Sequence, residues 1–200
     1  LGAAGKGYGQ EPGTVLWKVN LKHADQFNSP LSMDHNGTIF AGSGDTHKLY
    51  AVNPNGSIKW TIDVGGFVEF APAIDKDNTI YCGTWKGLYA INPDGSKKWS
   101  VTTSSKLVNS PAVGADGTVY FRTEESILYA INSDGSKKWS IKTSTKSGNS
   151  PIIGKEGTIF FSESPKDAIN PDGSINSSFD EIYYGETKRN LYAINPENSY

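Results

Sequence analysis

The chain has 200 residues, of which 36% are hydrophobic and 20% are charged, and its formal net charge is −2. This near-neutral balance excludes a global field that would attract nucleic acid or an anionic membrane surface. No stretch is apolar for long enough to cross a bilayer as a helix, so we expect neither a nucleic-acid partner nor a membrane span. The single cysteine, Cys82, can form neither an internal disulfide nor a multi-cysteine metal site.

Two phrases alternate along the chain. Residues 1–12 are predicted to form a flexible lead-in to a single domain over 13–200, which opens with GTVLWKVN from Gly13. The first phrase reads NSPLSMDHNGTIFAG from Asn28, FAPAIDKDNTIYCG from Phe70, NSPAVGADGTVYFR from Asn109 and NSPIIGKEGTIFFS from Asn149. The second reads LYAVNPNGSIKW, LYAINPDGSKKW and LYAINSDGSKKW, with an incomplete copy, AINPDGS, at Ala168 and a last one, LYAINP, at Leu191. A period of about 40 residues is that of a four-stranded propeller blade.

Each repeat predicts four short strands, which we name A to D. A glycine turn separates A from B and another, NPDGS, separates C from D, because glycine accepts the positive φ of a tight turn. β-branched and aromatic residues fill strands B and C. The sequence therefore predicts an all-β fold, a β-propeller of about five four-stranded antiparallel blades with one blade irregular or incomplete. The repeats are expected near residues 28–63, 70–102, 109–142, 149–175 and 176–200, the last completed by residues 13–20.

Four tryptophans recur at one place in strand D, and we expect them to lie buried between neighbouring blades. They are Trp17, Trp60, Trp99 and Trp139. Trp17 has no strand C before it, and LYAINP at the end of the chain has no strand D after it. We therefore expect residues 14–20 to pair with residues 190–194, within one chain or between two, because this closes an open sheet edge. The spacing from Ala168 to Ala193 is only 25 residues, too short for two further strands, and places the irregular blade there.

The phrase from Ala51 to Trp60, with the SPAV and DGTVY phrases, resembles the repeat of PQQ-like, quinoprotein-type β-propellers. In that family an alanine-to-tryptophan motif docks each blade onto the next, and the spacing here resembles that of the non-enzymatic members. The resemblance implies that an enzyme of the family would carry two adjacent cysteines, a calcium site of Glu, Asn and Asp, and a catalytic Asp. Cys82 has no adjacent cysteine, so we expect no enzymatic activity, no cofactor and no metal.

The B–C and D–A loops share one end of the blades and differ between repeats, so a binding site is expected there. The candidate residues are Trp85, Lys86, Phe67, Arg122, Asp45 and His47. Trp85 lies between glycines in the loop GTWKG; it either stacks on a ligand or folds over a blade edge. Phe67 is either a plug at the channel mouth or a contact. Solvated loop charges are the default interpretation of Arg122, Asp45 and His47.

Three functions remain open at this stage. The leading hypothesis is a non-catalytic binding module, exported or at the cell surface, whose loop-rich face binds a protein or a polysaccharide. The alternative is a scaffold that binds polypeptides, similar to the propeller lipoprotein of outer-membrane β-barrel assembly. A PQQ-dependent oxidoreductase is the third. The resemblance implies an extracytoplasmic location, and an incomplete ring would permit self-association.

Overall fold

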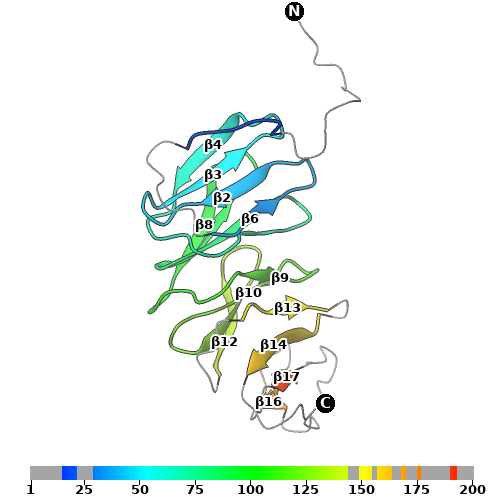
Figure 1. Ribbon diagram of the computed structural model, residues 1–200. Helices are drawn as coiled ribbons and strands as arrows, with labels where there is room; N and C mark the ends of the chain where they lie inside the picture. The colour runs from blue at the N-terminus through cyan, green and yellow to red at the C-terminus, as the bar shows by residue number, and fades with distance from the viewer. Residues whose placement is uncertain are drawn as a thin grey trace, which may run out of the picture.

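The computed structural model describes residues 15–21, 29–143, 149–154, 157–163, 168–169, 175–176 and 190–192. Every regular element within these residues is a β-strand, and the chain folds as a row of small antiparallel sheets (Figure 1). The all-β prediction is therefore confirmed.

Three of the sheets have the predicted four strands in sequence order. The first sheet contains β1 (Ser32–Met33), β2 (Ile39–Gly42), β3 (Lys48–Val52) and β4 (Ile58–Asp63). The second contains β5 (Ala73–Ile74), β6 (Ile80–Thr84), β7 (Gly87–Ile91) and β8 (Lys97–Thr102). The third contains β9 (Ala112–Val113), β10 (Val119–Arg122), β11 (Ile127–Ile131) and β12 (Lys137–Lys142). Strands A, B, C and D of the sequence are these strands in order, so the prediction of four-stranded antiparallel blades is confirmed for these three repeats.

The same irregularity recurs in all three sheets. Each tryptophan of strand D faces an alanine of strand C, and the register shifts one residue later; the pairs are Ala51–Trp60, Ala90–Trp99 and Ala130–Trp139. These alanines are fully buried. A larger side chain there would enter the space that the indole and its neighbours fill, which explains the alanine in each repeat.

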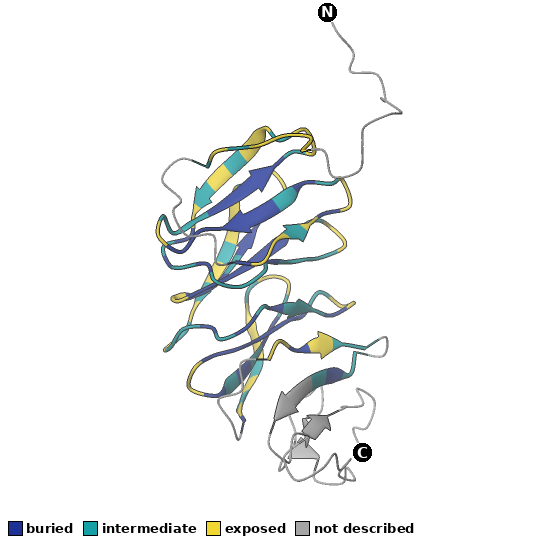
Figure 2. Cartoon of the chain, in the orientation of Figure 1, coloured by how far each residue is buried: buried dark blue, intermediate teal, exposed yellow. Residues whose placement is uncertain are grey.

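The hydrophobic core lies between the sheets. One cluster joins the first and second sheets through side chains such as Leu49 and Ile80, and a second joins the second and third through Leu88 and Phe121. Buried residues gather on the middle strands and exposed ones on the last strand of each sheet (Figure 2). The short A strands of successive sheets also contact one another.

The repeated tryptophans dock each sheet onto the next. The indole N–H of Trp60 donates to the Pro93 carbonyl at 3.0 Å, and that of Trp99 donates to the Ser133 carbonyl at 2.9 Å. Both carbonyls belong to the C–D turn of the following sheet. Trp60, Trp99 and Trp139 are half-buried, and Trp17 is 36% exposed. The expected position between sheets is therefore found for Trp17, Trp60 and Trp99, but the expected burial is only partial, because part of each indole stays exposed to solvent.

Residues 15–20 occupy the place of a strand D that would precede the first sheet. The indole N–H of Trp17 donates to the Pro54 carbonyl at 2.9 Å, as Trp60 and Trp99 do to their own following sheets. These residues form no strand, however, and β17 (Asn190–Tyr192) pairs with β14 (Ile159–Glu163) at the opposite end of the row (Figure 1). Among the described residues, the predicted pairing of 14–20 with 190–194 is therefore wrong within one chain, because 15–20 form no strand and 190–192 pair with β14; residues 14, 193 and 194 lie outside the described residues.

The irregular blade differs from its prediction in one respect. The fourth sheet contains β13 (Ile152–Ile153), β14 and β17, so its third strand comes from the last LYAINP copy. The copy at Ala168 instead forms a hairpin of β15 (Ala168–Ile169) and β16 (Ile175–Asn176). The reason is visible in the sequence. Lys166 and Asp167 stand where the other copies have Leu-Tyr, and that leucine is fully buried in each of the three complete sheets. A strand C there would bury a charge.

Candidate functional site

An aromatic cluster forms on the loop-rich end of the first three sheets. The rings of Phe67 and Trp85 lie 4.4 Å apart at 33°, and His47 meets Phe67 edge-on at 5.0 Å. His47 comes from the β2–β3 loop, Phe67 from the connection between the first and second sheets, and Trp85 from the β6–β7 turn. The fold thus joins three sequence-predicted candidates that lie up to 38 residues apart.

Two charged side chains hold the indole of Trp85. Its N–H donates to the Glu69 carboxylate at 2.9 Å, and the Lys106 ammonium lies over the ring, 4.7 Å from its centroid. Glu69 belongs to the connection before the second sheet and Lys106 to the connection after it. Trp85 still exposes 40% of its surface. We call His47, Phe67, Glu69, Trp85 and Lys106 the Trp85 cluster.

Trp85 stands on a tight two-residue turn. Thr84 pairs with Gly87, so Trp85 and Lys86 alone make the turn between β6 and β7. The Thr84 hydroxyl donates to the Gly87 carbonyl at 3.1 Å, and a Cβ on Gly87 would lie 2.0 Å from the Val101 carbonyl oxygen. The flanking Gly83 and Gly87 therefore serve strand pairing rather than a long open loop. Both glycines belong to strands, and the turn fixes the direction of Trp85.

The other candidates fall in different places. Lys86 is exposed beside Trp85, and Asp45 is exposed in the loop of His47, where it accepts a hydrogen bond from Ser43. Arg122 is fully buried at the end of β10, and its guanidinium donates to the Thr143 hydroxyl at 2.6 Å. The interpretation of Arg122 as a solvated loop charge is therefore wrong, because strand B extends one residue further into the interface than the loop boundary suggested.

Sequence reasoning missed Glu69 and Lys106. Neither belongs to the repeated phrases, and both approach Trp85 only because successive sheets pack side by side. A weak indication existed, since both lie in connections whose sequence changes from repeat to repeat. Nothing in the pattern says which side chain in such a connection turns toward a neighbour.

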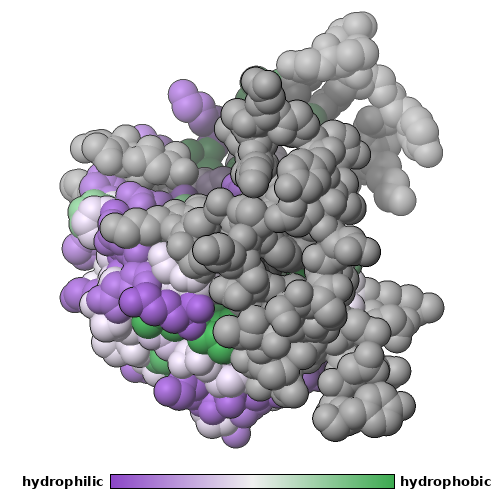
Figure 3. Space-filling view, turned by 90° about the horizontal axis from the view of Figure 1, so that it is seen from below, coloured by the Kyte–Doolittle hydropathy of each residue, from purple (hydrophilic) through white to green (hydrophobic). Residues whose placement is uncertain are grey.

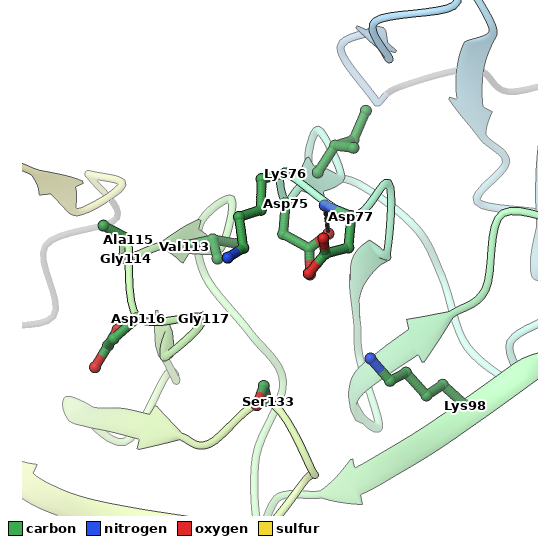
Figure 4. Close-up of a pocket in the computed structure, with 11 residues that line it drawn as sticks. Asp75, Lys76, Asp77, Lys98, Val113, Gly114, Ala115, Asp116, Gly117 and Ser133 are labelled. Carbon is green, nitrogen blue, oxygen red and sulfur yellow. Dashed lines mark hydrogen bonds between the residues drawn. The ribbon is translucent and has the colours of Figure 1, made fainter.

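A polar hollow lies at the opposite end of the sheets, between the A–B turns of the second and third sheets (Figure 4). Its volume is about 520 Å³. Lys76 extends toward Val113 in the space between the turns (Figure 4), and the Lys98 ammonium lies 3.5 Å from the Thr79 hydroxyl of its own sheet. Its aspartates serve the turns themselves: Asp75 accepts from the Thr79 backbone N–H and the Tyr81 hydroxyl. This hollow is therefore a product of turn chemistry, whereas the Trp85 cluster is not required by the repeat.

The hydrogen bonds of Asp116 alter its ionisation. Burial opposes the charged form, but hydrogen bonds from Thr118 and Lys138 outweigh it and lower the pKa of the Asp116 carboxyl. The Lys138 ammonium lies 3.1 Å from this carboxylate. Asp116 in the A–B turn and Lys138 in β12 therefore connect the turn of the third sheet to its last strand.

Cys82 is fully buried in β6, and burial raises the pKa of its thiol to about 12. A thiol needs its ionised form to act as a nucleophile or to bind metal.

Within the described residues, no three His, Cys, Asp or Glu side chains are grouped so as to hold a metal ion, and no helix there could span a bilayer. Where it is described, the end of the row seen in Figure 3 is mostly hydrophilic, with a small hydrophobic area.

The family of the chain follows from its repeats. One family model, described as outer membrane protein assembly factor BamB, matches the chain twice, over residues 6–155 and 76–199. The chain belongs to this family. The two matches overlap and together cover all the described sheets, as expected when a BamB-type repeat aligns in more than one register. The resemblance to quinoprotein-type propeller repeats is confirmed.

Solved structures support the same fold. BamB from Moraxella catarrhalis is 17% identical, with a TM-score of 0.62 over 74% of this chain and 46% of that one. A streptogramin B lyase is 11% identical, with a TM-score of 0.60 over 73% of this chain and 52% of that one. A protein of unknown function from Bacteroides caccae is 12% identical, with a TM-score of 0.51 over 72% and 58%. The chain thus spans about half the length of these structures, and at these identities they show the propeller fold alone. Among curated proteins, none matches the chain.

Proposed function

We propose that this chain is a non-catalytic interaction module that binds a protein partner through the loop-rich end of its sheets, with the Trp85 cluster at the centre of the contact. The observation that carries the proposal is the Phe67–Trp85 pair. A tryptophan that exposes 40% of its surface is held in one direction by a two-residue turn, a carboxylate and an ammonium. Aromatic anchors of this kind dominate the binding energy of protein interfaces.

The frame of the protein does not need this cluster. Sheet-to-sheet docking uses Trp60 and Trp99, whose hydrogen bonds go to carbonyls in the C–D turns, away from the loop-rich end. Repeats without a tryptophan in the B–C loop form the same four-stranded sheet. Because the turn, Glu69 and Lys106 already order this large side chain in the free protein, binding a partner costs less conformational entropy.

Protein, rather than polysaccharide, is the partner that the site favours. A sugar ring is neutral, whereas this indole has a carboxylate at its edge and a cation over its face, an arrangement that suits a charged side chain of a polypeptide. The family description names an assembly factor for outer-membrane proteins, which also supports a polypeptide partner and a location outside the cytoplasm. The proposal that the chain is not an enzyme rests on its one cysteine, which has no adjacent partner and is buried with a raised pKa.

The decisive experiment compares two tryptophans of similar exposure. Trp85→Ala removes the anchor, whereas Trp17→Ala removes a tryptophan that is 36% exposed and has an indole hydrogen bond of the same length, 2.9 Å, away from the cluster. Affinity capture with each variant, from extracts of the cells that make the protein, should recover a partner with the wild type and Trp17→Ala. Trp85→Ala should lose it, weakening the affinity by about 2 kcal/mol or more.

Parallel measurements separate the other functions. Melting curves show whether Trp85→Ala has unfolded the protein rather than removed a contact. Equal capture by Trp85→Ala and Trp17→Ala would contradict the proposed site. Specific binding on a glycan array, abolished by Trp85→Ala, would replace protein with polysaccharide. Alcohol-dependent dye reduction after addition of PQQ and calcium would contradict the non-catalytic function.

A further inference from the structure

The contacts of Trp85 combine a cation over an aromatic face with a carboxylate at the ring edge. The Lys106 ammonium lies 4.7 Å from the ring centroid, and the Glu69 carboxylate accepts the indole N–H at 2.9 Å. An indole is the aromatic ring that attracts cations most strongly. In this protein the cation comes from the chain itself, although the ring is part of an exposed turn.

We propose that the Trp85 cluster is a receptor for a cationic side chain of the protein partner, preferentially arginine, and that Lys106 occupies the receptor in the free protein. This inference rests on the proposed function and adds the chemistry of what is bound. On binding, the partner's guanidinium takes the place over the indole, and the Lys106 side chain turns into solvent.

Lys106 is suited to be displaced. Its backbone is fixed, because the N–H of Glu124 donates to the Lys106 carbonyl at 2.9 Å. Its side chain is half-buried, and within the part of the chain that the structure describes it makes no ion pair. The ammonium is therefore held over the ring by the cation–π contact alone, which contributes little at an exposed site. The side chain can leave without disturbing the connection that carries it.

The surroundings favour a cation over other ligands. Once Lys106 has turned away, the groups at the ring are the negative π face and the Glu69 carboxylate, and Glu125 lies one loop further, bonded to the Ser104 hydroxyl at 2.8 Å. An anionic side chain would meet these groups unfavourably. A neutral ligand would displace the Lys106 ammonium without supplying another cation, so the cation–π contact would be lost. Lys86, on the same turn, is exposed, so solvent screens its charge.

Arginine fits better than lysine. Its guanidinium is planar, stacks on aromatic faces and is more weakly hydrated than an ammonium. It can also donate from its edge to a carboxylate at the rim of the ring, as Glu69 is placed to accept. An incoming arginine therefore replaces the Lys106 contact with one of the same kind and adds hydrogen bonds.

The test uses small probes and the indole N–H resonance of Trp85, which Trp85→Phe assigns in a ¹⁵N correlation spectrum. The probes are N-acetyl-argininamide, N-acetyl-lysinamide and N-acetyl-citrullinamide, the last being a neutral molecule with nearly the shape of the first. We expect the arginine probe to shift the Trp85 resonance saturably, the lysine probe to do so more weakly and the citrulline probe not to shift it. The indole resonance of Trp17, which has no cation over it among the described contacts, is the internal control.

The variant Lys106→Ala removes the internal competitor. It should bind the arginine probe about two- to fivefold more tightly than the wild type, the gain expected for an exposed cation–π contact. Lys106→Gln should behave alike, which separates loss of charge from loss of packing. Tighter binding by both variants supports the proposal.

Weaker binding by both variants, or equal binding of citrulline and arginine probes, overturns it. If the probes fail while Trp85→Ala still loses the captured partner, the receptor for arginine is wrong and the proposed interaction face stands. If the probes bind as expected while the partner is captured regardless of Trp85, the proposed function is wrong and the receptor remains.

Discussion

Replacing Trp99 with alanine tests whether the repeated tryptophans hold the sheets together. The indole of Trp99 lies 5.7 Å from the ring of Tyr81, faces the glycine turn of the third sheet and donates to the Ser133 carbonyl at 2.9 Å. Because the side chain is half-buried, truncation exposes or vacates about 120 Å² of apolar surface, less than a buried tryptophan would. At about 25 cal/mol per Å² this corresponds to about 3 kcal/mol.

The lost hydrogen bond adds little, because the Ser133 carbonyl lies at the rim and water can replace the indole N–H. Trp99→Phe is the matched control. It keeps most of the apolar contact and loses the hydrogen bond, so we expect it to cost only about 1 kcal/mol. Urea titration followed by far-UV circular dichroism gives both values as shifts of the unfolding midpoint.

Two results would refute the docking argument. If Trp99→Ala unfolds at the same urea concentration as the wild type, the indole does not stabilise the interface between the second and third sheets. If Trp99→Phe costs as much as Trp99→Ala, the hydrogen bond rather than the buried area carries the contact, and the estimate from area is wrong.

Three further predictions concern the frame. Gly95→Ala should destabilise the protein by about 2–4 kcal/mol in the same titration, because Gly95 has a φ of +90° and a Cβ there would lie 2.7 Å from the Trp60 ring; unchanged stability would contradict this. Burial raises the pKa of the Cys82 thiol to about 12, so a thiol-reactive dye should label Cys82 only after unfolding, and rapid labelling of the native protein would contradict its placement. For Asp116, burial is outweighed by the turn's hydrogen bonds and the Lys138 ammonium, so the pKa is lowered and its stabilisation is present at neutral pH and lost as the pH falls through that lowered pKa. The advantage of wild type over Asp116→Asn should therefore begin to decline as the pH falls below 3.8, the ordinary value of the carboxyl, and be lost once the pH is below the lowered pKa; an advantage that does not decline in acid would contradict this.

The frame could be predicted from the sequence because it is repeated. Gly56, Gly95 and Gly135 lie at the same place in the C–D turn phrase. Each has a positive φ, and a Cβ on each would lie within 3 Å of an indole, so two separate constraints require glycine there. A glycine that recurs at the same place in three repeats indicates a structural requirement, whereas one glycine in one repeat would not. The irregular fourth sheet was also encoded: Lys166 and Asp167 make the copy at Ala168 unfit to be a buried strand, although its AINPDGS phrase suggested one.

The site could be predicted only in part. Trp85 departs from the other repeats, so the sequence identifies it as a candidate, and Phe67 and His47 come with it because they occupy loops at the same end. Lys106 and Glu69 depend on the side-chain directions of two irregular connections. The prediction that Arg122 is a solvated loop charge failed for a related reason. Its burial depends on where β10 ends, and no repeated phrase specifies that end.

The separation between frame and site has a physical cause. Docking contacts between sheets end on backbone carbonyls of the C–D turns, and the turns bond to themselves, as the Asn92 amide does to the Ser96 hydroxyl at 2.9 Å. None of these bonds uses a side chain of the loop-rich end. Substitutions there need not disturb these bonds, so one repeat can acquire Trp85, Glu69 and Lys106 while its neighbours keep polar B–C loops without an aromatic anchor. The proposed binding function therefore rests on side chains that differ between repeats, as Trp85, Glu69 and Lys106 do.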